Sequence, residues 1–537
     1  QVMELRARHR TGAAIKALLG LAPKTARRVD PSGAERDVPL EDVDVGDHLR
    51  IRPGEKVPVD GTVVGGESAV DESMLTGEPM PVVRQLGDTV IGGPLNKSGS
   101  FLFRASRIGR ETVLARIIEL VRDAQNAKPA IGRLVDRIAS VFVPTVLIIA
   151  ILTFLTWFNF GPDPKSAYAL VTMMTVLIIA CPCALGLATP ISIMAGIGKA
   201  AEQGILIRNG DALQMAGKLT VVVLDKTGTI TEGRPKVSQI LAHADSDEEL
   251  LALAAGLEKS SEHPLAEAVL EAARERNIPA VDIEHFEAVS GQGVIAEYDG
   301  EKVLFGNERL LQERGVNLDG LNELMAKVRT SIATPVLLAR AGTLSGILLI
   351  EDQIKHDSAE TILALKKLNI RTVMLSGDRQ ASAEAVASMV GIDEVVAEVL
   401  PQEKEQVIRK LQSAGEKVAM VGDGLNDAPS LARADVGFAI GNGTDVAIES
   451  ADVTLMGASI RGVPVAIELS RATVKNIWQN LFGAFIYNSI GIPVAAGIFY
   501  PVSGLLLNPM VAGAAMAMSS VTVVSNATRL RLWKPGR

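Results

Sequence analysis

Four stretches of the chain are apolar over the length of a bilayer and contain no internal charge: about Ala139 to Phe160, Ala169 to Gly198, Leu481 to Tyr500 and Leu505 to Ala527. A membrane-spanning helix needs about 20 such residues. We therefore predict four membrane helices in two helical pairs. Basic residues flank the outer ends of both pairs, whereas Lys165 is the only basic residue in the connecting loops. The positive-inside rule therefore places these loops away from the cytosol.

Two more polar blocks accompany the apolar stretches. Between Val29 and Gly109, short alternating runs separated by Gly, Pro and Asp predict a small β-rich domain: His48 to Ile51, Gly61 to Val64, Thr89 to Ile91 and Ser100 to Ala105. A basic amphipathic helix, Gln1 to Lys24, is expected before it. From about Ala200 to Gly462, strand-like and helix-like segments alternate, which indicates an open α/β sheet.

Composition agrees with a chain that has both membrane and aqueous parts. Apolar residues make up 47% of the chain and charged residues 22%. The apolar fraction exceeds that of an ordinary soluble enzyme, and the charged fraction is too high for a chain wholly in lipid. The net charge of -8 argues against nucleic-acid binding. Two cysteines, Cys181 and Cys183, provide no disulfide framework. Because the chain begins with Gln1 inside a predicted helix, we expect it to be part of a longer protein.

Polar side chains follow three predicted strands of the α/β block. Asp225 follows Thr220 to Leu224, Ser376 and Asp378 follow Arg371 to Leu375, and Asp423 follows Lys417 to Val421. The carboxyl ends of parallel strands line one crevice in such a sheet, so we expect these side chains to converge there. Residues 232–343 interrupt the block and are numerous enough for a domain of their own.

The chemistry predicted for this crevice is phosphoryl transfer to a carboxylate. Asp225 opens the run Asp-Lys-Thr-Gly-Thr, which continues through Lys226 and Thr227. An aspartate can attack phosphorus if Mg2+ and fixed donors offset the repulsion between two anions. We expect Asp225, Thr227 and Asp423 at the Mg2+ site, Thr227 and Ser376 as donors to phosphoryl oxygens, and Lys404 as the neutralising charge. Asn426 and Asp427 lie in the same loop as Asp423.

The predicted second span contains Cys181-Pro182-Cys183 near its middle. Proline breaks helical hydrogen bonding, and cysteines two apart meet disulfide geometry poorly, so we expect two thiolates at a helix break. Thiolates suit a soft cation such as Cu(I). No predicted span contains Asp, Glu, Lys, Arg or His, which disfavours hard cations and zinc. The third predicted span contains Tyr487 and Asn488, and the fourth contains Met516 and Ser520 as further candidate ligands. Met516 and Ser520 are four residues apart and so lie on one face of a helix.

These motifs resemble those of the P-type ATPases. The cysteines and the later candidate ligands in the predicted spans resemble the corresponding residues of the copper(I)-exporting branch of the heavy-metal (class IB) members. The resemblance covers the whole chain, with Ser376-Gly377-Asp378 replacing the usual Thr-Gly-Asp. It implies an aspartyl phosphate on Asp225, with ATP and Mg2+ as cofactors and Cu+ as the transported ion. It also implies that Thr76, Gly77 and Glu78 form the dephosphorylation loop, and that nucleotide is bound by Glu258, His263, Gly291 and Gly293.

The fold expected from this resemblance is multidomain α/β with at least four transmembrane helices. It combines a β-rich actuator domain with a haloacid-dehalogenase-like Rossmann phosphorylation domain that carries an inserted α+β nucleotide domain. The expected bounds are, in order: linker helix 1–28, actuator domain 29–112, linker helix 113–138, transmembrane hairpin 139–199, phosphorylation domain 200–231 and 344–475, nucleotide domain 232–343, transmembrane hairpin 476–530 and tail 531–537.

The expected activity is ATP-driven export of Cu(I), and of Ag(I), from the cytosol across a plasma or bacterial inner membrane in a multi-pass protein. Expected partners are the Cu(I) ion, membrane lipid and a cytosolic copper chaperone, with no nucleic acid. One alternative is a zinc, cadmium or lead exporter, which should carry a charged residue where Met516 and Ser520 stand. Another is a phosphatase of the haloacid-dehalogenase type or a metal sensor that does not transport.

Overall fold

The computed structural model describes residues 20–73, 81–126, 129–181, 183–243, 246–261, 264–289, 292–319, 321, 333–378, 380–400, 403–423, 427–441 and 451–536. The chain forms two compact units. The first comprises Gln1–Thr220, Ile408–Met420 and Gly424–Arg537, and the second comprises Val221–Val407 and Val421–Asp423. The predicted helix Gln1 to Lys24 lies almost wholly outside the described residues.

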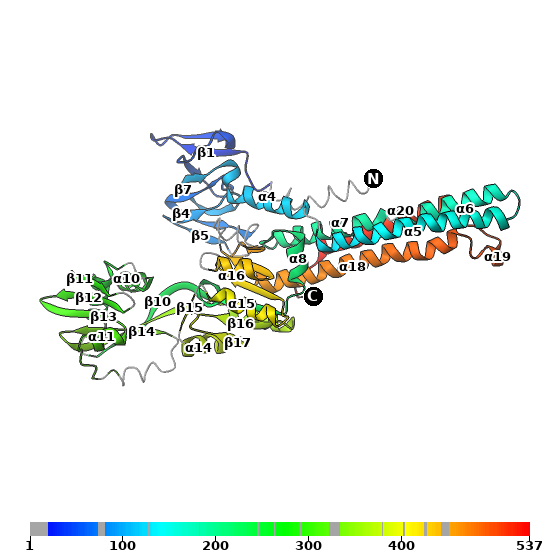
Figure 1. The fold of residues 1–537 in the computed structure, drawn as a ribbon. Helices are drawn as coiled ribbons and strands as arrows, with labels where there is room; N and C mark the ends of the chain where they lie inside the picture. The colour runs from blue at the N-terminus through cyan, green and yellow to red at the C-terminus, as the bar shows by residue number, and fades with distance from the viewer. Residues whose placement is uncertain are drawn as a thin grey trace. The chain divides into compact units, whose positions relative to one another are not determined.

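A seven-stranded sheet forms the predicted β-rich domain in the first unit (Figure 1), with strand order β2-β1-β3-β7-β4-β5 and β6 paired with β4. Its strands are β1 (Thr25–Val29), β2 (Glu35–Pro39), β3 (His48–Ile51), β4 (Asp60–Asp71), β5 (Val82–Arg84), β6 (Thr89–Val90) and β7 (Leu95–Arg107), with a short helix η1 (Leu40–Asp42). Phe101 and Phe103 alternate with more exposed residues along β7 and fill the core, as a strand with one buried face requires.

Asp60 joins this sheet to the segment that follows it. Its carboxylate accepts hydrogen bonds from the backbone N–H of Gly92 and of Val113, both at 2.8 Å. Burial raises the pKa of Asp60, and these two bonds oppose the rise. Val113 begins α4 (Val113–Asn126), which follows the short helix η2 (Gly109–Glu111).

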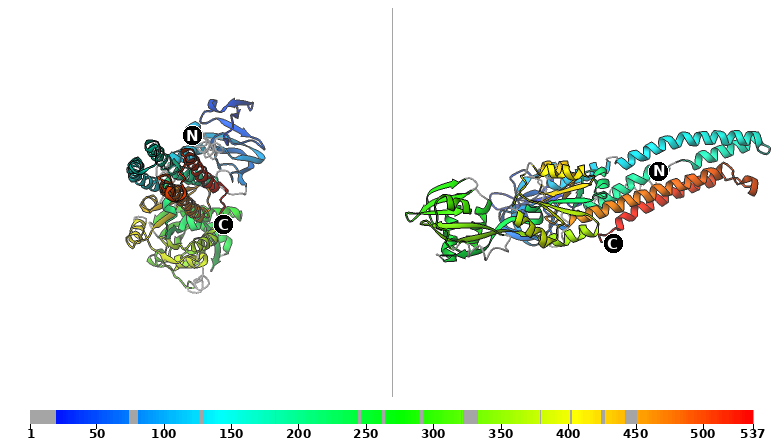
Figure 2. Two further views of the ribbon diagram at one scale, coloured as in Figure 1. Left: turned by 90° about the vertical axis from the view of Figure 1, so that its right-hand side faces the viewer. Right: turned by 60° about the horizontal axis from the view of Figure 1, so that its bottom comes forward.

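Apolar helices form a second part of the first unit. They are α5 (Ala130–Phe160), α6 (Lys165–Ile179), α7 (Cys183–Ala201), α18 (Gly462–Ala495) and α20 (Pro509–Thr528), with the short helices α19 (Tyr500–Ser503) and η4 (Arg529–Leu532). Figures 1 and 2 show the five long helices side by side. Within the described residues, Ala130–Phe160 and Pro509–Leu532 are long and apolar enough to cross a membrane, while Lys165–Ile179 and Leu185–Ala201 are shorter apolar helices.

The four predicted spans therefore have different outcomes. The first lies inside α5, and the last largely inside α20. The second is divided into α6 and α7, and this division confirms the helix break predicted at Cys181-Pro182-Cys183. Most of the third is the later part of α18, a continuous helix of 34 residues that begins at Gly462 and ends at Ala495, before the predicted end at Tyr500.

The predicted α/β sheet has seven strands in the order β17-β16-β9-β18-β19-β20-β8. They are β8 (Ile205–Ile207), β9 (Val221–Asp225), β16 (Arg371–Leu375), β17 (Glu394–Val396), β18 (Val418–Gly422), β19 (Val436–Ile440) and β20 (Val453–Leu455). The accompanying helices are α8 (Gly210–Ala216), α13 (Ser358–Lys367), α14 (Gln380–Val390), α15 (Lys404–Ser413) and α16 (Ala428–Arg433). Every residue of β9 is buried, as expected for an inner strand covered on both faces.

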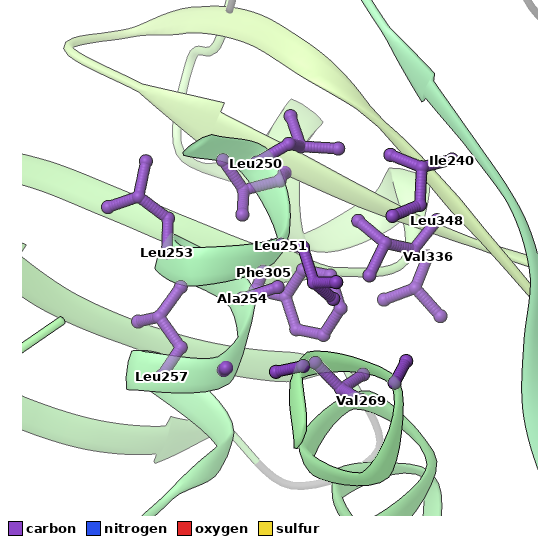
Figure 3. Close-up of a cluster of buried hydrophobic side chains, with 14 of the residues drawn as sticks. Ile240, Leu250, Leu251, Leu253, Ala254, Leu257, Val269, Phe305, Val336 and Leu348 are labelled. Carbon is purple, nitrogen blue, oxygen red and sulfur yellow. The ribbon is translucent and has the colours of Figure 1, made fainter. Parts of the chain in front are cut away.

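The inserted block folds around an antiparallel six-stranded sheet with the order β10-β15-β14-β13-β12-β11. Its elements are β10 (Thr231–Ala242), α9 (Asp247–Glu258), α10 (Pro264–Glu275), β11 (Glu284–Val289), β12 (Gly293–Tyr298), β13 (Glu301–Gly306), α11 (Glu308–Glu313), β14 (Thr334–Arg340) and β15 (Thr343–Ile354). Figure 3 shows Leu250, Leu251 and Val269 of its helices packed with Phe305 of the sheet. Burying a leucine side chain stabilises a fold by about 2 kcal/mol.

Candidate active site and membrane metal site

Asp225 is the last residue of β9, at the position predicted for the nucleophile. Strand β16 pairs with β9 in parallel and places Leu375 opposite Asp225, so Ser376 comes directly after that pair. On its other side β9 neighbours β18, which ends at Gly422, immediately before Asp423. The structure thus confirms that the three strands bring their polar carboxyl ends to one edge of the sheet.

Lys404 and Asp225 form the central ion pair of this edge. The Lys404 Nζ atom lies 2.7 Å from Asp225 Oδ1, and the two side chains are only 9% and 10% exposed. Removing a carboxylate from water is costly, and a close ammonium group offsets that cost. The pair therefore keeps a charged carboxylate in a largely dehydrated position and places Lys404 at the edge where it is predicted to neutralise phosphoryl oxygens.

The residues after Asp225 turn sharply away from the sheet in the segment η3 (Lys226–Ile230). Gly228 has a φ of 72°, a left-handed conformation that disfavours residues with a Cβ atom. Lys226 forms an ion pair with Asp378, and the Ser376 hydroxyl oxygen accepts the backbone N–H of Asp378 at 3.0 Å. Ser376 is buried, whereas Thr227 is exposed beyond the strand end.

Two residues outside the predicted site hold this turn in place. Lys355 Nζ donates to the Gly228 carbonyl at 2.8 Å, and its backbone N–H donates to the Ile230 carbonyl at 3.0 Å. The Ser358 hydroxyl donates to the same Ile230 carbonyl at 2.8 Å. Both residues follow β15, more than 120 residues from the turn, and they belong to none of the motifs analysed above, so no local signal pointed to them.

The carboxylates at this edge suit Mg2+. That ion prefers oxygen ligands and commonly takes one or two carboxylates, with water and substrate phosphate completing its coordination. Asp225 and Asp423 at the ends of neighbouring strands provide such a pair. Within the described part of the chain, no cluster of three or more His, Cys, Asp or Glu side chains could hold a metal. Asp427 is fully buried at the start of α16, and Asn426 lies outside the described residues.

The predicted nucleotide residues are described only in part. Glu258 is buried at the end of α9, while His263 and Gly291 lie outside the described residues. Gly293 has a φ of 145° and pairs with Gly306 between β12 and β13. A Cβ atom on Gly293 would lie 2.3 Å from the Phe305 carbonyl oxygen, so close strand packing already requires glycine there.

The predicted dephosphorylation residues Thr76, Gly77 and Glu78 also lie outside the described residues. The strands on either side of them are joined by Glu72 and Arg84, whose side chains form an ion pair at 2.7 Å. Nearby, hydrogen bonds from the Ser73 hydroxyl and from Lys97 lower the pKa of Asp71. The Glu72–Arg84 pair thus holds the end of β4 to β5, and the Asp71–Lys97 pair holds it to β7.

The membrane cysteines lie where α6 gives way to α7. Cys181 is exposed after the end of α6, Pro182 is outside the described residues, and Cys183 is the first residue of α7. Cys181 is disulfide-bonded, contrary to the expectation of two unlinked thiolates. The side chain of Cys183, the chain's other cysteine, is not among those described. Metal ligation by a cysteine thiolate requires the reduced form.

The later helices bury some of the predicted metal residues and expose others. Asn488 of α18 is 3% exposed, and its Oδ1 atom has no hydrogen-bond partner among the described residues. The preceding Tyr487 is 44% exposed. In α20, Met516 is buried and Ser520 is half-buried. Met516 packs in one apolar cluster with Ala180, which precedes Cys181, so α20 and the helix break are brought together.

Comparison with known proteins agrees with this architecture. Residues 20–122 match the P-type ATPase actuator domain, and residues 219–435 match the haloacid dehalogenase-like hydrolase family. The chain is 51% identical over 531 residues to a copper-exporting P-type ATPase of Legionella pneumophila, covering 99% of this chain and 72% of the relative. It is 50% identical to a silver exporting P-type ATPase of Salmonella typhimurium, covering 100% of this chain and 65% of the relative.

A solved structure extends the likeness to the whole fold. A zinc-transporting PIB-type ATPase in its E2.Pi state superposes with a TM-score of 0.65 and 33% identity, covering 98% of this chain and 86% of that one. A copper-exporting P-type ATPase of Vibrio cholerae is 52% identical over 98% of this chain, which spans 58% of that relative's length. Since about half of its residues match those of copper exporters over nearly its entire length, the chain belongs to the heavy-metal P-type ATPases.

Proposed function

We propose that the full-length protein exports Cu(I) from the cytosol through a cycle in which Asp225 is phosphorylated by ATP. The buried ion pair of Asp225 with Lys404 at the end of β9 carries this proposal. In the phosphorylation step, an Asp225 carboxylate oxygen bonds to the γ-phosphorus of ATP, and the bond to the β,γ-bridging oxygen breaks. ADP leaves, and water later releases the phosphate from Asp225.

The chain's own residues have separate roles in that step. Lys404 offsets negative charge at the reacting carboxylate, and the Ser376 hydroxyl and Thr227 donate hydrogen bonds to phosphoryl oxygens. Lys226, through its ion pair with Asp378, and Lys355, through Gly228, hold the turn after the nucleophile. When bound at Asp225 and Asp423, Mg2+ supplies positive charge against the phosphate oxygens. We assign Glu78 to the orientation of the hydrolytic water, and Glu258, His263, Gly291 and Gly293 to nucleotide binding.

For the transported ion, we propose ligands from Cys181, Cys183, Asn488 and Met516, with Tyr487 and Ser520 along the pathway. Reduced cysteines and a thioether favour soft monovalent ions. Silver is a second candidate because Ag(I) has similar ligand preferences and one close relative is named a silver exporter. We place the protein in a plasma or bacterial inner membrane as a multi-pass protein that receives copper from a cytosolic chaperone, and we retain the domain bounds given above.

The test is metal-stimulated phosphorylation of the reduced full-length protein by ATP labelled at the γ-phosphate. We expect acid-stable labelling that depends on Cu(I) or Ag(I), is not supported by Zn(II), and disappears in Asp225→Asn. Labelling that persists in Asp225→Asn would refute the nucleophile. Stimulation by Zn(II) alone would refute the choice of ion, and vesicles that bind Cu(I) without accumulating it would indicate a sensor.

A further inference from the structure

A buried polar network joins the three helices that carry most of the proposed copper ligands. It consists of Ser192 on α7, Asn476 and Asn480 on α18, and Asn526 on α20, all in the same compact unit. Ser192, Asn476 and Asn480 are 0%, 7% and 2% exposed. Polar side chains buried between apolar helices are costly unless their hydrogen bonds are made, so this network is a constraint on how the helices pack.

Asn480 is the centre of the network. Its Nδ2 group donates to Ser192 Oγ and to Asn476 Oδ1, both at 3.1 Å, and its Oδ1 atom accepts from Asn526 Nδ2 at 2.9 Å. One side chain thus uses both amide hydrogens and its carbonyl to connect α18 with α7 and α20. Two further bonds close the network: Ser192 Oγ lies 2.9 Å from Asn476 Oδ1, and Asn476 Nδ2 donates to the Asn526 carbonyl at 2.9 Å.

The network lies at a similar distance from the proposed ligands on each helix. With a rise of about 1.5 Å per residue, Ser192 is about 14 Å beyond Cys183, Asn480 about 12 Å before Asn488, and Asn526 about 15 Å beyond Met516. Hydrogen bonds that fix the positions of Ser192, Asn480 and Asn526 along the helix axes therefore also fix the relative positions of the three ligand residues along those axes. A shift of α18 by one residue would break the contacts of Asn480 and move Asn488 by about 1.5 Å.

We propose that Ser192, Asn476, Asn480 and Asn526 are positioning residues that set the longitudinal register of the copper-ligating helices and thereby the affinity for Cu(I). This inference rests on the proposed function. The network is not proposed to bind metal, since the amide and hydroxyl groups of Asn480, Asn476, Ser192 and Asn526 bond to one another. Its role is to bring Cys183, Asn488 and Met516 together before the ion arrives, so that ligand binding does not have to order the helices.

The test uses the reduced full-length transporter and the variants Asn480→Leu, Asn526→Leu and their combination. We expect Asn480→Leu to raise the Cu(I) concentration for half-maximal ATPase activity about tenfold while kcat changes less than twofold, since two interhelical hydrogen bonds are lost. Phosphorylation by inorganic phosphate without copper should persist, which would show that the cytosolic machinery is folded. The double variant should resemble Asn480→Leu, because both changes break one network.

Thr522→Val is the matched control, because Thr522 is an exposed polar residue of α20 whose hydroxyl donates to the Met518 carbonyl of the same helix. A half-maximal Cu(I) concentration within twofold of wild type in Asn480→Leu would overturn the inference, as would an equal change in Thr522→Val. If Asn480→Leu loses phosphorylation by inorganic phosphate, the half-maximal Cu(I) concentration of Asn526→Leu is measured instead, and a value within twofold of wild type would overturn the inference. Asn526 is only half-buried, so this substitution disturbs the fold less. A wild-type protein without Cu(I) stimulation would instead refute the proposed function, so the two failures are distinguishable.

Discussion

Replacing Lys404 with methionine tests the electrostatics of the phosphorylation site. Methionine keeps most of the aliphatic side chain and removes the ammonium group that lies 2.7 Å from Asp225 Oδ1. The gross attraction at that separation is about 6 kcal/mol with an effective dielectric constant of 20. Desolvation of both groups offsets much of it, and losing one partner of a buried pair costs about 3 kcal/mol. We expect a loss of that size in the local stability of β9.

Hydrogen–deuterium exchange of the β9 amides measures this loss in the whole protein. Peptides covering Val221 to Leu224 report opening of a fully buried strand. Asp225→Asn and the double variant complete a double-mutant cycle with Lys404→Met. Because the double variant leaves neither charge buried alone, its stability should exceed that expected from adding the two single effects by about 2 kcal/mol. Lys410→Met, at an exposed position of the same helix, is the control and should change little.

Additive effects in this cycle would refute the reasoning, because they would mean that the two charges do not stabilise one another. The same conclusion would follow if Lys410→Met slowed or accelerated exchange as much as Lys404→Met. Raising the salt concentration should leave the coupling nearly unchanged, since a pair about nine-tenths buried is poorly screened.

Three further predictions concern packing and pH. Gly293→Ala should destabilise the β12–β13 pair by about 3 kcal/mol, because alanine would be strained at this positive φ and overpacked. Hydrogen exchange without nucleotide measures this loss. As a control, Gly300→Ala, at a φ of 74° with open space around it, should cost about 1 kcal/mol. Gly491→Val should collide with Ile179, 2.5 Å from the Cβ position, and weaken Cu(I) activation of ATPase activity severalfold, while Gly483→Val, with nothing within 4 Å, should not. Burial raises the pKa of Asp435, but hydrogen bonds from the Val418 N–H, Gln412 and Lys417 outweigh burial and lower the pKa below the ordinary 3.8. The ionised carboxylate therefore stabilises the folded state above pH 3.8, and this stabilisation is lost as pH falls through the folded-state pKa. Hydrogen exchange of β18 should lose that pH dependence in Asp435→Asn.

The strand ends of the catalytic sheet were predictable because apolar runs followed by polar residues mark the carboxyl ends of buried strands. Asp225 and Ser376 lie where that pattern put them, and the break after α6 follows from Pro182. The anchors of the turn were not predictable, because Lys355 and Ser358 act through tertiary contacts with carbonyl groups distant in sequence.

The length of α18 also escaped the sequence analysis. Arg471, Lys475, Asn476 and Asn480 lower the hydropathy before Leu481, so the apolar pattern marked only the later part of this helix. Hydropathy cannot show that Asn476 and Asn480 are buried, since their burial depends on hydrogen bonds to other helices. Gly293 is a similar case, because the proximity of β13, which only the fold reveals, explains this glycine without any ligand.

The continuity of α18 has a mechanical consequence. Its 34 residues form a rod about 50 Å long. Its first residue, Gly462, lies against Leu455, where a Cβ atom would come within 2.6 Å of that side chain, so the rod is seated on strand β20. A tilt of about 5° at this seat would displace the far end by about 4 Å over such a length. The helix is thus a lever arm that can convert a small rotation at the sheet into a shift larger than one hydrogen bond within the lipid bilayer.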